Sequence, residues 1–352
     1  GKRDIGPQGS SYREHLNYTS EGMYQETIKD MDAFFSGKDP STRNLSHWQH
    51  QVSVNDSFSL LPNDGLEMDH SPESLKYLRK DQPVLYWHGN YIWQFVDRVA
   101  RKMNELHPEK KVVCLAYQTY AQPPDPDVVK EFTDNVVVGV AALSGPSHIV
   151  KDFSAEGGKK RLLELLNKWD AITDHPFLYW SYFSWGGRPA AAGVIPVMIP
   201  HNMQEYYQVL AEYGKYCFAC HTGGMGNLTL HHLNRYMVYK LLWNPDLNMD
   251  ALIADYCDTY YGPASDAMRS FFSELFDYTK EILYRRADIS QIWDDYYTAG
   301  NVRTLRRHLE DAKKEAGDSE YGKRLESIDK WLLTRIEKGR EKYIDEVKVL
   351  RE

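Results

Sequence analysis

The sequence lacks both a long apolar run and an excess of positive charge. No stretch approaches the roughly 20 apolar residues of a membrane-spanning helix, so we expect no membrane span. Asp and Glu (50) outnumber Lys and Arg (42), and the net charge at pH 7 is -8. Because binding to a phosphate backbone needs a basic surface, we also expect no nucleic-acid partner. The basic stretches near the C-terminus are interleaved with acids, which is typical of solvated helix faces.

Cysteine is scarce, and its pattern does not favour a metal site. Cys217 and Cys220 form a C-x-x-C within an apolar segment that is typical of a strand. Residues three apart on a strand point to opposite faces, so the two sulfurs cannot jointly bind a metal or form an easy redox pair. His221, His231 and His232 follow, but their spacing matches no known zinc ligand set. We expect neither a metal nor another cofactor.

The chain begins at Gly1, without an apolar leader or a cleavage pattern. A removed signal peptide and a fragment of a longer protein both account for this start. Neither the localisation nor the oligomeric state therefore follows from the residues themselves.

Aromatic residues, by contrast, are plentiful. The 25 tyrosines and 9 tryptophans often stand beside predicted strand ends or turns. Tyr and Trp side chains combine a flat apolar face with a polar edge, which suits stacking on sugar rings. The alternative is an aromatic-rich core. The core is favoured for any single residue, and sugar contact is favoured for the group at the strand ends.

Apolar periodicity alternates between helix and strand along the first two thirds of the chain. Ile92 to Leu106 have helical spacing until His107-Pro108 ends the pattern, and short apolar strands follow at 112–116 and 136–140. Further helices are predicted at 20–35, 162–169, 203–213 and 230–243, and further strands at 58–61, 177–180 and 216–220. This alternation is typical of parallel βα units.

These units predict an α/β fold of the (β/α)8 TIM-barrel type. About six units are present if the segment near Leu16 is a strand, so we expect the barrel to be N-terminally incomplete. Strand patterns cease after Trp243, and residues 249–286 and 302–349 have helical periodicity. We therefore expect a barrel domain of the catalytic type at residues 1–245 and an α-helical domain at residues 246–352.

One turn follows a predicted strand where barrels place their chemistry. The apolar segment from Phe58 ends in Pro62-Asn63-Asp64-Gly65, which delivers an amide and a carboxylate to the carboxyl end of a strand. The alternative is an Asn-Asp-Gly turn chosen for its backbone geometry. We favour a functional role for Asp64.

Several short motifs occur in a specific order over residues 12–275. They are 58–65, 91–108 with the Ala116-Tyr117 strand end and Pro123-Pro124, 135–148, Trp169, Tyr179 to Tyr182, Leu241 to Asp246, and Tyr260-Tyr261-Gly262. Together they resemble a bacterial family catalogued as domain of unknown function 4838, members of which include glycoside hydrolase family 163.

The resemblance implies a (β/α)8-type barrel followed by helices, and a carbohydrate substrate with β-linked N-acetylglucosamine in complex glycans. It also favours a periplasmic or extracellular localisation. The substrate-binding residues that we expect are Asn63, Tyr117, His148, Tyr179, Tyr182 and Trp185. One departure concerns catalysis: where relatives are expected to carry a glutamate near the last barrel strand, residues 218–224 contain no carboxylate.

Hydrolysis of a glycosidic bond normally takes two carboxyl groups, and a substrate-assisted variant still needs a proton donor. Asp64 is the carboxylate that the sequence places at a strand end. Weaker candidates for the second carboxyl group are Asp56, Glu14 and Glu205. His221 is the candidate acid in place of the missing glutamate, because an ordinary imidazole donates protons near neutral pH. A strand-end histidine without a catalytic role is the alternative. Two hypotheses therefore stay open: a glycoside hydrolase and a catalytically inactive carbohydrate-binding barrel.

Overall fold

The structure, a computed structural model, describes residues 15–48, 56–63, 69–83, 86–141, 158–173, 175, 177–181, 195–213, 218–219 and 228–349. Contacts group the chain into two compact units. The first takes in Gly1–Ala142, Leu162–Trp180 and Tyr213–Cys217, and the second Leu143–Arg161, Ser181–Glu212 and Phe218–Glu352. No described helix is both long and apolar enough to span a membrane.

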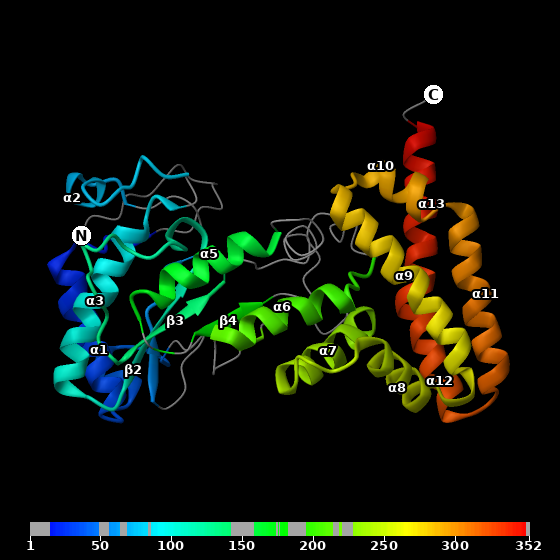
Figure 1. Ribbon diagram of the computed structural model, residues 1–352, viewed down its shortest axis with the longest axis horizontal. Coiled ribbons are helices and arrows are strands. Elements are labelled where there is room, and N and C mark those ends of the chain that lie inside the picture. The colour runs from blue at the N-terminus through cyan, green and yellow to red at the C-terminus, as the bar shows by residue number, and fades with distance from the viewer. Residues whose placement is uncertain are drawn as a thin grey trace. The chain divides into compact units, whose positions relative to one another are not determined.

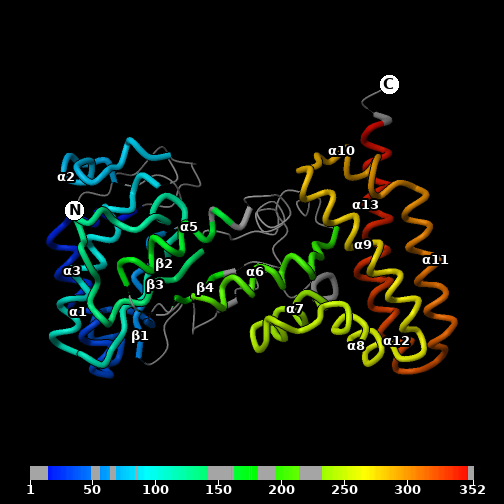
Figure 2. Tube along the Cα trace, in the orientation of Figure 1, coloured from blue at the N-terminus to red at the C-terminus, as the bar shows by residue number. Residues whose placement is uncertain are grey.

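Short strands form the sheet, in the order β1-β2-β3-β4-β5, and Figure 2 labels β1 to β4 along the chain trace. Their bounds are Ser57–Ser59 for β1, Lys111–Ala116 for β2, Val136–Val140 for β3, Leu178–Ser181 for β4 and Phe218–Ala219 for β5. Parallel pairing joins β1 to β2, β2 to β3 and β3 to β4. Ala116 opposes Val140, and Val140 opposes Tyr179, so the three lie at one level near the carboxyl edge.

This sheet is not the N-terminally incomplete barrel of the (β/α)8 type that the sequence predicted. Within the described residues the sheet has five strands, β1 pairs with β2 alone, and residues 228–349 are helical without a strand. The segment near Leu16 is not a strand either: Leu16 precedes a turn and is 60% exposed. Alternating β and α segments dictate parallel pairing of neighbours, but closure also needs a full set of strands with matched tilt and stagger.

The first unit also contains helices, of which α3 packs against β2 (Figure 1). They are α1 (Glu21–Phe35), the short α2 (Pro72–Leu75), α3 (Gly89–Leu106) and α5 (Gly158–Asp170), with 3-10 turns η1 (Pro40–Arg43) and η3 (Gln118–Tyr120). As predicted, Ser20 caps α1. The apolar stripe of α3 is buried from Ile92 to Met103, and the rings of Trp93 on α3 and Trp169 on α5 lie 4.5 Å apart.

The described part of the second unit consists mainly of helices. Its helices are α6 (Pro200–Tyr213), α7 (Leu228–Trp243), α8 (Met249–Tyr261), α9 (Ser265–Arg285), α10 (Ile289–Gln291), α11 (Ala299–Ala316), α12 (Glu320–Ile328) and α13 (Thr334–Val349). A 3-10 turn, η6 (Gly262–Ala264), joins α8 to α9, and two π-helical turns interrupt the later helices: η7 (Ile292–Tyr296) and η8 (Asp329–Leu333). Small polar residues favour helix starts, because their side chains accept hydrogen bonds from the first turn. Three of these helices begin in this way: Asn248 caps α8, Thr298 caps α11 and Ser319 caps α12.

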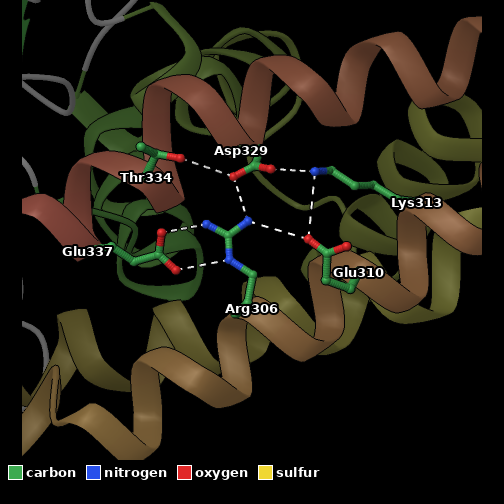
Figure 3. Close-up of polar contacts among 6 residues, drawn as sticks. All are labelled: Arg306, Glu310, Lys313, Asp329, Thr334 and Glu337. Carbon is green, nitrogen blue, oxygen red and sulfur yellow. Dashed lines mark hydrogen bonds and ion pairs between the residues drawn. The ribbon is translucent and has the colours of Figure 1, made fainter.

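One half-buried arginine ties the last helices together. The Arg306 guanidinium on α11 donates to both carboxylate oxygens of Glu337 on α13, at 2.9 and 2.6 Å, and to Asp329 at 2.6 Å (Figure 3). Lys313 also pairs with Asp329. These charged side chains are therefore more than the solvated helix faces that the sequence predicted.

Candidate functional site

Asn63 and Tyr117 follow two neighbouring parallel strands. Beyond β1, the Leu60 N–H donates to the Val113 carbonyl at 2.7 Å, and the chain continues to Asn63, which is exposed. Tyr117 directly follows β2 with an extended backbone, at φ -141° and ψ 146°. Both residues therefore leave the sheet at its carboxyl edge, the edge at which α/β proteins bind ligands.

Tyr179 lies within the sheet rather than beyond it. It opposes Val140 in register and is 2% exposed. Its proposed part in substrate binding stays a prediction. The other predicted site residues, Asp64, His148, Tyr182, Trp185 and His221, lie outside the described residues, as do Glu14, Cys217 and Cys220.

Two of the alternatives to Asp64, Asp56 and Glu205, lie within the described residues. Asp56 immediately precedes β1, so it stands at the amino end of the strand, where its carboxylate contacts Lys110 Nζ at 2.7 Å. Glu205 lies on α6.

The segment after β2, residues 117–125, is called the β2 loop here. The second residue of this loop is Gln118. Its φ of 46° is in the left-handed region that non-glycine residues rarely adopt. The Gln118 side-chain amide donates to the Tyr117 hydroxyl at 2.9 Å. Backbone strain of this kind gathers at functional sites, so Gln118 marks the loop as a candidate.

Side chains from α3, from α5 and from the segment after α2 hold the β2 loop. The indole N–H groups of Trp93 and Trp169 donate to the carbonyls of Tyr120 and Ala121, at 3.0 and 2.9 Å. The Arg79 guanidinium donates to the Pro123 carbonyl at 2.8 Å, and Asn90 exchanges two hydrogen bonds with Asp125. The loop therefore keeps a fixed shape, which favours a pre-organised site.

Gly89 allows α3 to begin against this loop. A Cβ atom on Gly89 would lie 2.8 Å from the Gln122 carbonyl oxygen, closer than real Cβ contacts. The absence of a side chain thus sets the distance between the start of α3 and the β2 loop.

His88 stands directly before α3 and touches the same loop. Its backbone N–H donates to the Thr119 carbonyl at 2.8 Å, and the residue is 7% exposed. Burial, together with the smaller effect of the nearby imidazoles of His70 and His15, lowers the pKa of His88 to about 4. His88 is therefore neutral at neutral pH.

A carboxylate lies close to this histidine. Asp69 accepts hydrogen bonds from the Ser71 N–H at 3.1 Å and from the Ser74 hydroxyl. Burial alone would raise the pKa of Asp69, but these hydrogen bonds outweigh it and lower the pKa below its usual value. Tyr91, whose ring centroid lies 6.3 Å from that of His88, interacts with Ser74. Asp69 is thus an ionised carboxylate that Ser74 and Tyr91 link to His88.

Sequence reasoning missed His88, Gln118 and Asp69. The signal for His88 was its position before the periodic run of α3, where a helix cap is expected. No pattern marked the other two residues. In the described residues no group of three or more His, Cys, Asp or Glu side chains could hold a metal ion.

Comparison with known families supplies a further observation. The sequence model of one family, described as Domain of unknown function (DUF4838), matches residues 42–273, well over half of the chain. The chain belongs to the DUF4838 family. The DUF4838 match covers β1, the β2 loop and all five strands, and continues into α9. No curated protein matches the chain.

Proposed function

We propose that this DUF4838 protein binds glycans containing β-linked N-acetylglucosamine and hydrolyses them as a glycoside hydrolase. The observation that carries the proposal is that Asn63 and Tyr117 leave neighbouring parallel strands at one edge, beside a strained and firmly held loop. An aromatic ring with a polar edge and a side-chain amide are the groups that bind sugars. The resemblance to glycoside hydrolase family 163 supports the choice of substrate.

Asp64 is the proposed acid or amide-orienting group, because it directly follows Asn63. His221 is the proposed second proton-transfer group, and His148, Tyr182, Trp185 and Tyr179 complete the proposed substrate contacts. Asp69 is a further described carboxylate, held by the Ser71 N–H and the Ser74 hydroxyl.

The test is hydrolysis of a complex glycan by the wild type and two aspartate variants. Asp64→Asn should keep the fold and sugar affinity but lower turnover about 100-fold or more, the usual scale for a general acid. Asp56→Asn is the matched control, because Asp56 stands at the opposite end of the same strand, and it should retain turnover. Undiminished activity of Asp64→Asn would remove Asp64 from the mechanism.

A catalytically inactive carbohydrate-binding protein is the second candidate. The absence of a carboxylate from residues 218–224 favours it. It predicts that the wild type binds N-acetylglucosamine oligosaccharides with measurable affinity but releases no product in the same assay.

A further inference from the structure

The helices α12 and α13 follow each other without a break, joined by the π-helical turn η8. At this turn the Thr334 N–H donates to the Asp329 carbonyl, five residues back, where an α-helix would use the Lys330 carbonyl. The π-helical turn therefore takes in one residue more than an α-helical turn. Because each residue of an α-helix contributes about 100° of rotation, α13 is turned by about that angle relative to an uninterrupted α-helix.

The apolar residues of this segment do not require the extra residue. Leu325, Ile328, Leu332, Ile336 and Tyr343 are all buried. In an uninterrupted α-helix, with about 100° per residue, these five positions would lie within roughly 80° of one another. That is an ordinary amphipathic stripe. The apolar pattern alone thus favours a regular α-helix here.

The charged residues do require it. Asp329 and Glu337 would lie roughly 80° apart around the axis of a regular α-helix, and the extra residue of η8 reduces this angle to about 20°. Both carboxylates then reach the Arg306 guanidinium, Asp329 at 2.6 Å and Glu337 at 2.9 and 2.6 Å (Figure 3). These three residues are called the Arg306 clamp here. The Thr334 hydroxyl also donates to the Asp329 carboxylate at 3.2 Å, between positions that an α-helix would not place side by side.

The Arg306 clamp is charged at neutral pH. Burial raises the pKa of Asp329, but hydrogen bonds from Lys313 and Arg306 outweigh burial and lower the pKa below its usual value. Glu310 and Lys313 on α11 also face the clamp, at 3.5 Å from Arg306 and in contact with Asp329 respectively. The clamp side chains are only 21% to 30% exposed, so solvent and salt screen them less than a surface ion pair.

Contacts with η7 fix the rotation of α13. The Arg340 guanidinium donates to the carbonyls of Trp293 and Tyr297, at 2.7 and 2.9 Å. The Tyr343 hydroxyl donates to the Asp294 carboxylate at 2.8 Å. Because α13 is held in this way, a change of register at η8 would turn α12.

The contact that a turn of α12 would break is made by Arg324. Its guanidinium donates to the Tyr260 carbonyl on α8 at 2.8 Å and lies 4.6 Å from the centroid of the Tyr260 ring. Arg324 lies roughly 20 Å from Glu337 along the helix axis, at about 1.5 Å per residue. It therefore makes no direct contact with the clamp.

We infer that the Arg306 clamp is a latch that holds η8 in its π-helical form against the apolar pattern. Loss of charge on the clamp returns η8 to α-helical hydrogen bonding, which turns α12 relative to α13 and releases Arg324 from Tyr260. The second unit thus contains a conformational switch, because its charged and apolar residues favour different registers of one helix. The inference goes beyond the proposed function and does not rest on it.

A double-mutant cycle between Glu337→Gln and Arg324→Met tests the latch by denaturant unfolding. Distant residues without a shared partner normally contribute independently to stability. In the wild-type background, Arg324→Met should raise the unfolding equilibrium constant about tenfold, because a hydrogen bond from a charged group is lost. In the Glu337→Gln background Arg324 has already left Tyr260, so the same substitution should raise the constant by less than about twofold.

Glu346→Gln is the matched control. It makes the same chemical change on α13, but Glu346 pairs only with Lys342, at 3.7 Å and at the surface, among the ion pairs of the described residues. In this background Arg324→Met should raise the unfolding constant as much as it does in the wild type.

A crystal structure of Glu337→Gln reads the register directly. The Thr334 N–H should donate to the Lys330 carbonyl in this variant, as in a regular α-helix. The inference is overturned if the Thr334 N–H still donates to the Asp329 carbonyl, or if Arg324→Met has the same effect in the wild-type and Glu337→Gln backgrounds.

Discussion

His88 gives the first unit a specific dependence on pH. Its pKa is lowered to about 4 in the folded protein by burial and by the neighbouring His70 and His15, against roughly 6.5 in an unfolded chain. Between these two values the unfolded state binds more protons than the folded state, so the free energy of unfolding decreases as the pH falls. At most about 3 kcal/mol is lost across this window, because each pKa unit corresponds to roughly 1.4 kcal/mol.

The measurement is denaturant unfolding of the wild type and of His88→Gln at several pH values between 4 and 7. The wild type should lose stability as the pH falls, and the variant should lose distinctly less. Equal slopes in the two proteins would show that His88 does not cause the dependence.

Residues at the site differ in how far the sequence reveals them. Asn63 and Tyr117 were predictable, because an apolar run that ends in polar or aromatic residues marks a strand end. The neutral state of His88 could not be predicted, because it follows from burial against residues some 30 positions away, including Thr119. The left-handed backbone of Gln118 was not predictable either, since glutamine has no preference for it.

At the scale of secondary structure, the proposed site depends on the junction between α3 and the β2 loop. Gly89→Ala should destabilise the protein by about 1 to 3 kcal/mol, because the added methyl meets the rigid Gln122 carbonyl. Sugar affinity should fall as the loop shifts. Gly22→Ala is the control, because the nearest atom to its added Cβ is 3.7 Å away on α1, and this variant should gain about 0.5 to 1 kcal/mol. Equal unfolding midpoints for the two variants would contradict this account of the junction.

Arg306 makes the corresponding junction in the second unit. Arg306→Lys keeps the charge but loses the two-pronged contact with Glu337, so we expect a loss of about 1 to 3 kcal/mol in unfolding experiments. Lys342→Ala is the control, because Lys342 makes an exposed 3.7 Å ion pair with Glu346, and it should change stability by less than about 1 kcal/mol. If Arg306→Lys loses no more unfolding free energy than the control does, the Arg306 network does not stabilise the second unit.

Individual helices and strands were largely predictable. The spacing from Ile92 to Leu106 predicted α3, the apolar runs 112–116 and 136–140 predicted β2 and β3, and Ser20 marked the start of α1. These elements are encoded by local periodicity and capping. The π-helical turns η7 and η8 were not predicted, because they replace one helical hydrogen-bond register by another within an unchanged apolar pattern.

The barrel was the error at the scale of the whole molecule. Open parallel sheets and closed barrels share the same βα alternation, so the local pattern predicts parallel neighbours and not closure. Pairing of the first strand with the last decides closure, and in the described residues β1 pairs with β2 alone.

The boundary between residues 245 and 246 stays a prediction, with a direct test. Contacts group α6 and α7 with the later helices, and Gln204 on α6 donates to the Pro245 carbonyl at 3.2 Å. We expect a fragment of residues 246–352 to unfold cooperatively by circular dichroism, and a fragment of residues 195–352 to be more stable. A non-cooperative shorter fragment beside a cooperative longer one would move the boundary toward the N-terminus.

Hydrogen exchange of the wild type, with and without N,N′-diacetylchitobiose, tests most directly whether the carboxyl edge of the sheet binds the glycan. The sugar should slow exchange of the backbone amides at residues 60–63 and 117–121, where β1 and β2 end. Exchange at Lys111, at the amino end of β2, should not change and serves as the internal reference. Protection confined to other parts of the chain, or none at saturating sugar, would contradict the account.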